Sequence, residues 1–359
     1  MRICIVVPYD LAEQGGVKRH AFQLAAALRG LGDDVTVMGA SSTPAEEPSV
    51  HVFGGIVNIR SNGSDNRLAI LTPPWKIRRW LDEQAFDVIH VHEPLCPLLA
   101  PWAALFAGSA TLVGTFHAFA EKEERGPKFM RWWSAPLILP RFARAIAVSE
   151  PAAAYARFVW KRELAIIPNG IAMDIFRPTS PRPHGGKLRL LFVGHWRDGR
   201  KGLPVLLEAV SLLHDRGVPV SLDVVGSGPA GVAPPELPGV TFHGPAAGAS
   251  EIATYLNECD VFVAPSLGQE SFGIVLLEAM ASGRAIACSD IAGYREVVSE
   301  ENARIVAPGS AVALAAAIAD LAQDPEERSA MAQRNVHRAE QFAWSTLVHR
   351  VRAEYQAAS

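Results

Sequence analysis

The sequence predicts an α/β protein built from two facing Rossmann-like, doubly wound domains with an interdomain cleft. Short β-rich runs alternate with helical patterns along the chain, which is typical of βα repeats around a parallel sheet. A loose segment rich in Pro and Gly, residues 177–186, interrupts the alternation near the middle, as a linker between domains does. Ligands of such sheets bind outside the carboxyl ends of the strands, so two facing domains place them in the cleft.

The first half of the chain supplies one clear helix and a series of short strands. Residues 16–30 form a helical pattern directly after a Gly-Gly pair, which predicts the first helix. Short apolar runs predict strands at 2–7, 34–38, 87–91, 110–115, 143–148 and 164–167.

After the linker the alternation restarts. The second set of strands is predicted at 188–193, 220–225, 240–242, 260–264, 284–288 and 304–306. A helix is predicted over 272–281, opened by Ser271 and ended before Gly283. The last helical pattern, 344–355, either closes the second domain or crosses back to the first.

Composition excludes several classes of protein. With 359 residues, 49% hydrophobic and 20% charged, the chain is suited to a globular enzyme of about two domains. A net charge of −3 gives no electrostatic argument for binding nucleic acid. The four cysteines lack the paired spacing of a zinc site or disulfide framework. No run is long enough for a signal peptide or a membrane span. We therefore expect a cytoplasmic protein, or a peripheral one on the inner face of the cell membrane.

Two glutamates, one just before the predicted helix 272–281 and one within it, are the most informative candidates for binding. Glu270 lies at the junction of loop and helix, and Glu278 interrupts an apolar run further along the helix. The amides of Ser271, Phe272, Gly273 and Ile274 would point out of the helix N-terminus, where unsatisfied donors and the dipole favour a phosphate group. The carboxylates could then hold hydroxyls at the two ends of a sugar joined to an anion. The alternative is that both are ordinary solvated helix residues.

Two further loops could approach an anion. Gly15 and Gly16 directly precede the first helix, so backbone amides can come close to a ligand there; a plain tight turn is the alternative. The pattern is not GxGxxG, so a dinucleotide is not supported.

The second loop follows strand 188–193 and contains Arg197, Arg200 and Lys201. Its cations could stabilise a diphosphate leaving group without a metal, unless they are only exposed surface charges. We expect no metal site and no cofactor besides a sugar-nucleotide co-substrate.

Together these motifs resemble the family-four retaining glycosyltransferases of the GT-B fold, over essentially the whole chain. The resemblance rests on the Gly15-Gly16 pair, on His117, on the run Arg200-Lys201-Gly202, and on Glu270 with Glu278. Within that family the chain is most similar to the bacterial phosphatidylinositol mannosyltransferases. Further matching runs are Pro8-Tyr9, His90 to Pro94, Thr115 to His117, Ala147 to Ser149, Pro168 to Gly170 and Gly268 to Leu276.

The resemblance implies a role for each candidate residue. Glu270 would contact the transferred sugar and Glu278 the ribose, while Arg200 and Lys201 would bind the donor diphosphate. Gly16 and the amides of residues 271–274 would complete the phosphate cradle. His117 would lie at the reacting centre, where a neutral imidazole can accept a hydrogen bond from a sugar hydroxyl; a structural hydrogen bond is the alternative.

The resemblance also implies the domain organisation. The last helix of the family crosses back to the first domain, which favours that course for 344–355. We therefore expect an acceptor-binding domain of residues 1–172 with 344–359, and a sugar-nucleotide-binding domain of residues 173–343.

The chain departs from the mannosyltransferase pattern at the donor site. His195 stands where the family has an arginine, with Arg197 two positions on, so diphosphate binding could be weaker or rearranged. The loop 244–251 lacks a family lysine, so guanine is not assured.

The acceptor pattern is kept only in part. Asn62, Ser64 and Arg67 match it, whereas Lys18 replaces a glutamine and Ser61 a tyrosine. Tyr9, Lys18, Asn62 and Arg67 are the expected acceptor contacts. Inositol lipid is therefore one candidate acceptor among several.

A lipid acceptor would call for a surface that meets the membrane. The run from Trp75 to Leu81, read as a helix, carries Lys76, Arg78 and Arg79 beside apolar Ile77, Trp80 and Leu81, the pattern of an interfacial helix drawn to anionic lipid. Residues 129–133 add a second aromatic and basic patch. The alternative is an ordinary amphipathic helix packed on the sheet.

The sequence therefore predicts a metal-independent, retaining hexosyltransferase that moves mannose from GDP-mannose to a lipid or other alcohol. A UDP-sugar-dependent enzyme acting on a soluble acceptor is the second hypothesis. A catalytically silent sugar-nucleotide-binding protein is the third.

Overall fold

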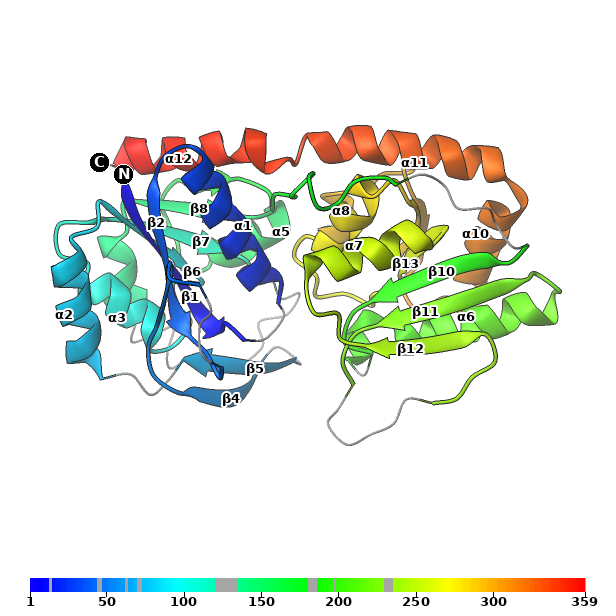
Figure 1. Ribbon diagram of the computed structural model, residues 1–359, viewed down its shortest axis with the longest axis horizontal. Coiled ribbons are helices and arrows are strands. Elements are labelled where there is room, and N and C mark those ends of the chain that lie inside the picture. Colours follow the sequence, from blue (N-terminus) through cyan, green and yellow to red (C-terminus); the bar gives the residue numbers. More distant parts are fainter. Residues whose placement is uncertain are drawn as a thin grey trace. The chain divides into compact units, whose positions relative to one another are not determined.

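The structure is a computed structural model that describes residues 1–12, 15–43, 47–61, 64–69, 73–119, 135–179, 186–196, 198–228 and 235–358. The chain divides into two compact units (Figure 1). The first consists of Met1–Gly170 with Trp344–Ser359, and the second of Ile171–Ala343. The division predicted from the sequence lies two residues later, after residue 172.

A parallel sheet forms the centre of the first unit, with strand order β3-β2-β1-β6-β7-β8-β9. Its strands are β1 (Arg2–Asp10), β2 (Asp34–Ala40), β3 (Val50–Val52), β6 (Val88–His92), β7 (Thr111–Phe116), β8 (Arg144–Ala147) and β9 (Ala165–Ile166). A hairpin of β4 (Ile56–Ser61) and β5 (Ser64–Ala69) joins β1 through the antiparallel pair Tyr9 and Leu68. Neither β3 nor this hairpin was predicted from the sequence.

Helices cover the two faces of this sheet. They are α1 (Gly16–Gly30), α2 (Pro74–Gln84), α3 (Leu99–Leu105), α5 (Glu150–Ala156) and α12 (Trp344–Ala358), with a 3-10 turn at Leu139–Arg141. Alternate residues of a strand point to opposite faces, so Ile89 and Val91 of β6 pack with α2 and α3. The other face of β6, which carries His90 and His92, meets α1 and α12.

The second unit repeats the layered arrangement around a parallel sheet of order β12-β11-β10-β13-β14-β15. Its strands are β10 (Leu188–Val193), β11 (Val220–Val225), β12 (Val240–Gly244), β13 (Val261–Ala264), β14 (Ala285–Ser289) and β15 (Arg304–Val306). Most lie within one or two residues of the predicted bounds, because each is a short apolar run between turn residues.

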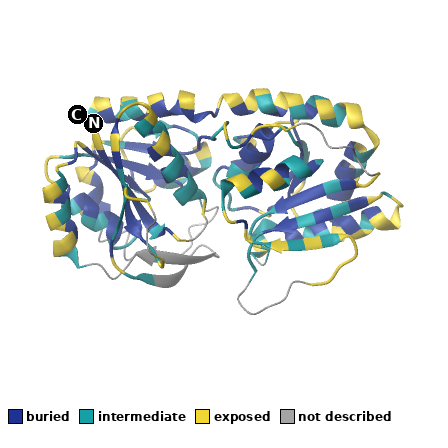
Figure 2. Cartoon of the chain, in the orientation of Figure 1, coloured by how far each residue is buried: buried dark blue, intermediate teal, exposed yellow. Residues whose placement is uncertain are grey.

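The helices of the second unit are α6 (Leu203–Asp215), α7 (Ala249–Glu258), α8 (Ile274–Ala281), α9 (Ala292–Arg295), α10 (Ala311–Gln323) and α11 (Pro325–Glu340). A 3-10 turn, η2 (Gly199–Lys201), precedes α6. Apolar residues of α6 and α10 pack with Leu190, Leu222 and Val261 in one core. Figure 2 shows the central strands of both sheets buried while the outer faces of the helices are exposed.

Within the described residues, no helix is both long and apolar enough to cross a membrane.

Candidate functional site

Two loops of the second unit meet at the carboxyl ends of neighbouring strands. One follows β10 and the other follows β13, and the amide of Leu267 donates to the carbonyl oxygen of Arg200 at 2.7 Å. Gly202 has a φ of +70°, and a Cβ added to it would lie 1.9 Å from the carbonyl oxygen of Pro265. Only glycine allows so close an approach in this conformation. The fold therefore holds the Arg200-Lys201 segment against the Glu270 loop.

Lys201 and Glu270 form an ion pair between these loops. Nζ of Lys201 donates to Oε1 of Glu270 at 2.6 Å. The two side chains are 22% and 17% exposed, so the pair remains accessible to a ligand while being partly shielded from water. The structure thus brings together two residues that the sequence assigned separately to diphosphate and to sugar.

Arg200 has a carboxylate partner that the sequence analysis did not consider. Its Nε and Nη2 donate to the two carboxylate oxygens of Asp198, at 3.2 and 2.6 Å. Asp198 also caps the η2 turn by accepting the amide of Arg200 at 3.0 Å. The loop therefore holds the Arg200 guanidinium through its own carboxylate, and a role for Arg200 at a diphosphate stays a prediction.

The helix after β13 begins later than the sequence predicted. Helix α8 starts at Ile274, with Gly273 at the N-cap in a left-handed conformation, φ +89°. Ser271 is therefore not the cap, and Ser271 and Phe272 belong to the loop. The prediction was wrong because Gly268, Gln269 and Gly273 all take positive φ values, which a helical pattern of side chains does not reveal.

The amides of Gly273 and Ile274 still lie at the helix N-terminus. The preceding loop is held tightly, because a Cβ on Gly293 would lie 2.0 Å from the carbonyl oxygen of Glu270. Glu278 lies within α8 and is only 1% exposed. It is therefore not the ordinary solvated helix residue that was the alternative.

His195 lies where β10 and β11 end side by side. Its Nδ1 lies 2.6 Å from the hydroxyl of Ser227. A Cβ on Gly226 would lie 1.9 Å from the carbonyl oxygen of Gly194, so these loops are also in close contact. Arg197 falls outside the described residues.

In the first unit, a group of buried histidines surrounds His117. His90 and His92 alternate along β6, so they share a face, and their rings stack with centroids 4.6 Å apart. Nδ1 of His92 lies 2.8 Å from Nε2 of His117. The ring of His20, from α1, stands edge-on to both His92 and His117.

Helix α12 holds this group from the side. The hydroxyl of Tyr355 lies 2.7 Å from Nδ1 of His90, and Oγ1 of Thr115 lies 2.6 Å from Nε2 of His90. Trp344 packs edge-on against His20, and its indole N–H donates to the side chain of Gln23 at 2.9 Å.

Burial keeps these imidazoles neutral. It lowers the pKa of His20 from 6.5 to about 4 and that of His90 to about 3. Burial, with neighbouring imidazoles, lowers the pKa of His92 and of His117 well below 6.5. All four rings are therefore uncharged at neutral pH.

Glu93 fixes the backbone beside His117. Its Oε1 accepts the amides of His117 and Ala118, both at 2.6 Å. Burial raises the pKa of Glu93 from 4.5 to about 7, although these two hydrogen bonds oppose the rise. Glu93 takes φ +50°, a strained conformation that is common at functional sites.

Three of the histidines could hold a metal ion. One ring nitrogen each of His20, His92 and His117 lie within 4.8 Å of one another. Nitrogen ligands on tetrahedral zinc are about 3.3 Å apart, given bonds of about 2.0–2.1 Å. The 2.8 Å between His92 and His117 is shorter, and it is the geometry of a hydrogen bond between neutral rings.

The predicted acceptor residues are only partly described. Tyr9 is partly buried near the end of β1, and Gly16 opens α1. Burial lowers the pKa of Lys18, whose ammonium lies 5.8 Å from the centre of the Phe22 ring. Asn62 lies outside the described residues, as does the side chain of Arg67.

The predicted interfacial helix has its apolar face turned inward. In α2, Ile77 is fully buried and Leu81 is 5% exposed, and both belong to the core of the first unit. The expectation that this face meets the membrane was wrong. Basic residues lie outside instead, where Arg78 and Arg79 pair with Asp82 and Glu83 at 3.7 and 2.7 Å. Residues 129–133 are outside the described part.

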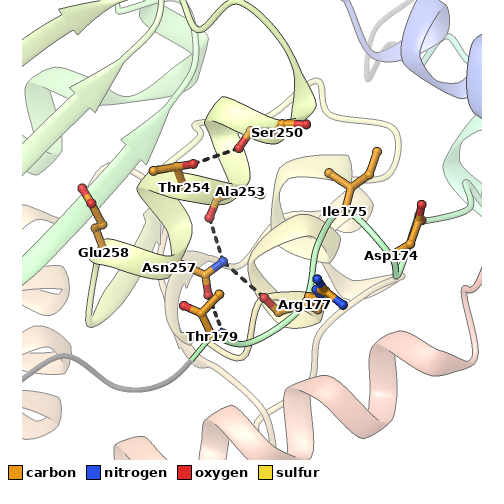
Figure 3. Close-up of a pocket in the computed structure, with 9 residues that line it drawn as sticks. All are labelled: Asp174, Ile175, Arg177, Thr179, Ser250, Ala253, Thr254, Asn257 and Glu258. Carbon is orange, nitrogen blue, oxygen red and sulfur yellow. Dashed lines mark hydrogen bonds between the residues drawn. The ribbon is translucent and has the colours of Figure 1, made fainter.

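A separate hollow of about 410 Å³ lies between α7 and the segment that opens the second unit (Figure 3). The side chain of Asn257 crosses it, donating to the carbonyl oxygens of Arg177 and Ala253 and accepting the amide of Thr179. Through these bonds Asn257 holds residues 177–179 against α7.

Sequence reasoning missed the roles of His20, His92 and Glu93. A signal for His92 was available, because His90 and His92 alternate within a short strand and therefore share one face. The contact of His20 with this face depends on tertiary packing, which no local pattern indicates.

Comparison with known proteins gives matches along the whole chain. Residues 14–175 match the family described as glycosyltransferase family 4, and residues 187–324 match glycosyl transferases group 1. A phosphatidyl-myo-inositol mannosyltransferase of Mycolicibacterium smegmatis is 33% identical over 100% of this chain and 94% of that protein.

Solved structures share the fold at lower identity. Sucrose-phosphate synthase of Thermosynechococcus elongatus has a TM-score of 0.76 and 22% identity, with both chains covered fully. Anabaena HepE in complex with UDP-glucose has a TM-score of 0.78 and 18% identity, over 99% of this chain and 100% of that one. These likenesses show the GT-B fold.

Proposed function

The chain belongs to glycosyltransferase family 4, and we propose that it transfers mannose from GDP-mannose to a lipid-linked acceptor of the phosphatidylinositol type. The observation that carries this proposal is the 33% identity to a phosphatidyl-myo-inositol mannosyltransferase over the full chain. The paired loops of the second unit support it, because they offer a cation, a carboxylate and a helix N-terminus together.

We propose that Lys201 binds the donor diphosphate while it stays in contact with Glu270. An ammonium has three N–H donors, and the contact with Glu270 uses one. The others can reach phosphate oxygens, and the α8 N-terminus adds amides and a favourable dipole. Glu270 then accepts hydroxyls of the sugar, and Glu278 is proposed to accept those of the ribose.

The proposed reaction is retaining and needs no metal. The acceptor oxygen forms a bond to the anomeric carbon on the same face from which the phosphate leaves. The bond between that carbon and the phosphate oxygen breaks, and the acceptor proton passes to the departing phosphate. The products are the mannoside and GDP. Lys201 and the helix dipole stabilise the negative charge that develops on the diphosphate.

The first unit is proposed to hold the acceptor. Tyr9, Lys18, Asn62 and Arg67 are the proposed contacts, and His117 is proposed to lie at the reacting centre. A lipid acceptor requires the enzyme to reach a membrane surface. The exposed cations of α2, Lys76, Arg78 and Arg79, suit an anionic leaflet, whereas the apolar face of that helix is occupied by the core.

A UDP-sugar donor with a soluble acceptor is the second candidate, and the loop before α7 favours it. Loop 244–251 contains no lysine, and Oε2 of Glu251, in the first turn of α7, accepts the amide of Ala247 at 2.6 Å. The base would therefore meet a different partner from the one that the mannosyltransferases provide.

Thermal unfolding with GDP, UDP and ADP separates the donors, because a ligand that binds only the folded state raises its stability. We expect GDP to raise the midpoint temperature of unfolding more than UDP or ADP does. Release of GDP from GDP-mannose, in the presence of phosphatidylinositol vesicles and lost in Glu270→Ala, identifies an enzyme. Binding without turnover of any donor would instead indicate a silent sugar-nucleotide-binding protein.

A further inference from the structure

Nδ1 of His92 lies at hydrogen-bond distance, 2.8 Å, from Nε2 of His117. We propose that His92 is a positioning residue that fixes the tautomer of His117, so that His117 carries its proton on Nδ1 and presents it to an oxygen of the substrate. The inference rests on the proposed function in placing substrate beside His117.

The two nitrogens share a single proton. Both rings are neutral at pH 7, because burial lowers the pKa of each well below 6.5. A neutral imidazole has one N–H and one bare nitrogen. The contact therefore has either His92 donating from Nδ1 or His117 donating from Nε2.

The other ring nitrogen of His92 decides between these cases. In the described part of the chain, Nε2 of His92 is buried and has no hydrogen-bond partner. A proton there would be an orphaned buried donor, which is rare and costs about 1–3 kcal/mol. The proton therefore lies on Nδ1 of His92, which donates to Nε2 of His117. Neutral His117 must then hold its own proton on Nδ1.

The surrounding contacts hold the plane of the His92 ring. Its ring is stacked on His90, which Tyr355 and Thr115 hold at both nitrogens. The backbone of His117 is fixed separately, since Glu93 accepts its amide at 2.6 Å. Side chain and main chain of His117 are thus both anchored by the strand end of β6.

This arrangement changes what His117 can do. The family resemblance implied a neutral imidazole that accepts a hydrogen bond from a sugar hydroxyl. With Nε2 occupied and Nδ1 protonated, His117 donates instead and cannot take the acceptor proton. That proton must go elsewhere, in agreement with the proposed transfer to the leaving phosphate.

The direct test is nuclear magnetic resonance of the full chain with ¹⁵N-labelled histidine. Long-range proton–nitrogen correlations show which ring nitrogen carries the proton, and His117→Asn identifies the signals of His117. We expect a protonated Nδ1 and a bare Nε2 at pH 7. A protonated Nε2 on His117 overturns the inference, whether or not the protein has transferase activity.

Substitutions at His92 give a second, independent readout. Asparagine places an N–H close to the position of Nδ1, whereas phenylalanine keeps the ring shape without a donor. We expect His92→Asn to keep the His117 tautomer and most of kcat. His92→Phe should lose the tautomer and lower kcat on the order of 10- to 100-fold, with little change in the KM for donor. Equal kcat in the two variants would argue for a purely structural His92.

Discussion

The ammonium of Lys201 lies 2.6 Å from the carboxylate of Glu270, and this pair joins the loops that follow β10 and β13. Lys201 ends the short η2 turn and Glu270 lies in a loop, and a tight glycine contact on each side holds the two residues together. Contacts within the chain therefore hold the two residues of the proposed donor site, and such preorganisation reduces the reorganisation that catalysis requires.

Separate substitutions of the pair should have different effects on binding. Lys201→Ala should weaken GDP binding at least tenfold and lower kcat/KM on the order of 10²–10³-fold, because a cation at the diphosphate is lost. Glu270→Ala should lower kcat/KM by a similar factor while GDP binds as well or better, since Lys201 loses its counter-charge. Isothermal titration with GDP and initial rates check both.

Arg334→Ala is the matched control for these variants. Arg334 pairs with Glu327 at 2.9 Å in α11 of the same unit and belongs to neither loop. This variant should change neither the affinity for GDP nor kcat/KM by more than about twofold. Loss of GDP binding in Glu270→Ala as large as in Lys201→Ala would contradict the separate roles.

Gly202 should be sensitive to a single added methyl group. Gly202→Ala places a Cβ 1.9 Å from the carbonyl oxygen of Pro265 at φ +70°. We expect a loss of stability of at least about 1–2 kcal/mol and weaker GDP binding, because the two loops must separate.

Gly199→Ala, in the same loop, is the control, since a Cβ there meets nothing within 4 Å. Urea unfolding and GDP titration compare the two variants. Equal stability of Gly202→Ala and Gly199→Ala would show that the loops are not held as described.

The buried histidines and Glu93 should give opposite dependences of stability on pH. His90, with its pKa lowered from 6.5 to about 3, adds stability that is present above pH 6.5 and is lost as pH falls. Between pH 6.5 and 5 this loss is about 2 kcal/mol. Glu93, with its pKa raised from 4.5 to about 7, adds stability that is full below pH 4.5 and is lost as pH rises through 7.

Urea unfolding at pH 5, 6 and 7 therefore distinguishes two variants. His90→Gln should be less stable than the parent at pH 7 but should lose less stability on acidification. Glu93→Gln should lose more, because the opposing contribution of the carboxyl is gone. The same pH slope in both variants would show that neither group titrates as inferred.

The basic face of α2 should govern binding to anionic vesicles. In a sedimentation assay, the combined variant Lys76→Ala, Arg78→Ala, Arg79→Ala should bind these vesicles with an affinity lower by more than about tenfold. Each such cation contributes about 1 kcal/mol at the surface. Helix α2 should stay folded because Ile77 and Leu81 remain in the core.

The acidic partners on the same helix supply the converse variant. Asp82→Asn with Glu83→Gln removes the carboxylates that pair with Arg78 and Arg79, so binding to anionic vesicles should increase. Sedimentation that neither variant alters would exclude α2 as the membrane contact.

Much of the fold follows from local pattern. Helix α1 and strands β10, β11 and β15 have the predicted bounds, because apolar runs and turn residues mark their ends clearly. The hairpin β4–β5 was missed, since its run Ser64–Ala69 is mostly polar and lacks the apolar pattern that marks the other strands.

The candidate site was predictable where residues lie in one motif and not where packing unites distant segments. The run from Glu270 to Glu278 indicated a site at a helix entrance, although positive φ values moved the start of α8 to Ile274. Two contacts could not be inferred, because they depend on side-chain directions set by the fold. They are the ion pair of Arg200 with Asp198 and the packing of the His20 ring against His117.

Product analysis tests the central claim most directly. The purified chain is given GDP-mannose and phosphatidylinositol in anionic vesicles, and the lipid fraction is analysed by mass spectrometry beside Glu270→Ala protein. We predict a lipid heavier by one hexose with the parent chain and none with the variant. An unmodified lipid fraction, together with hexose transfer from a UDP-sugar to a soluble alcohol, would contradict the account.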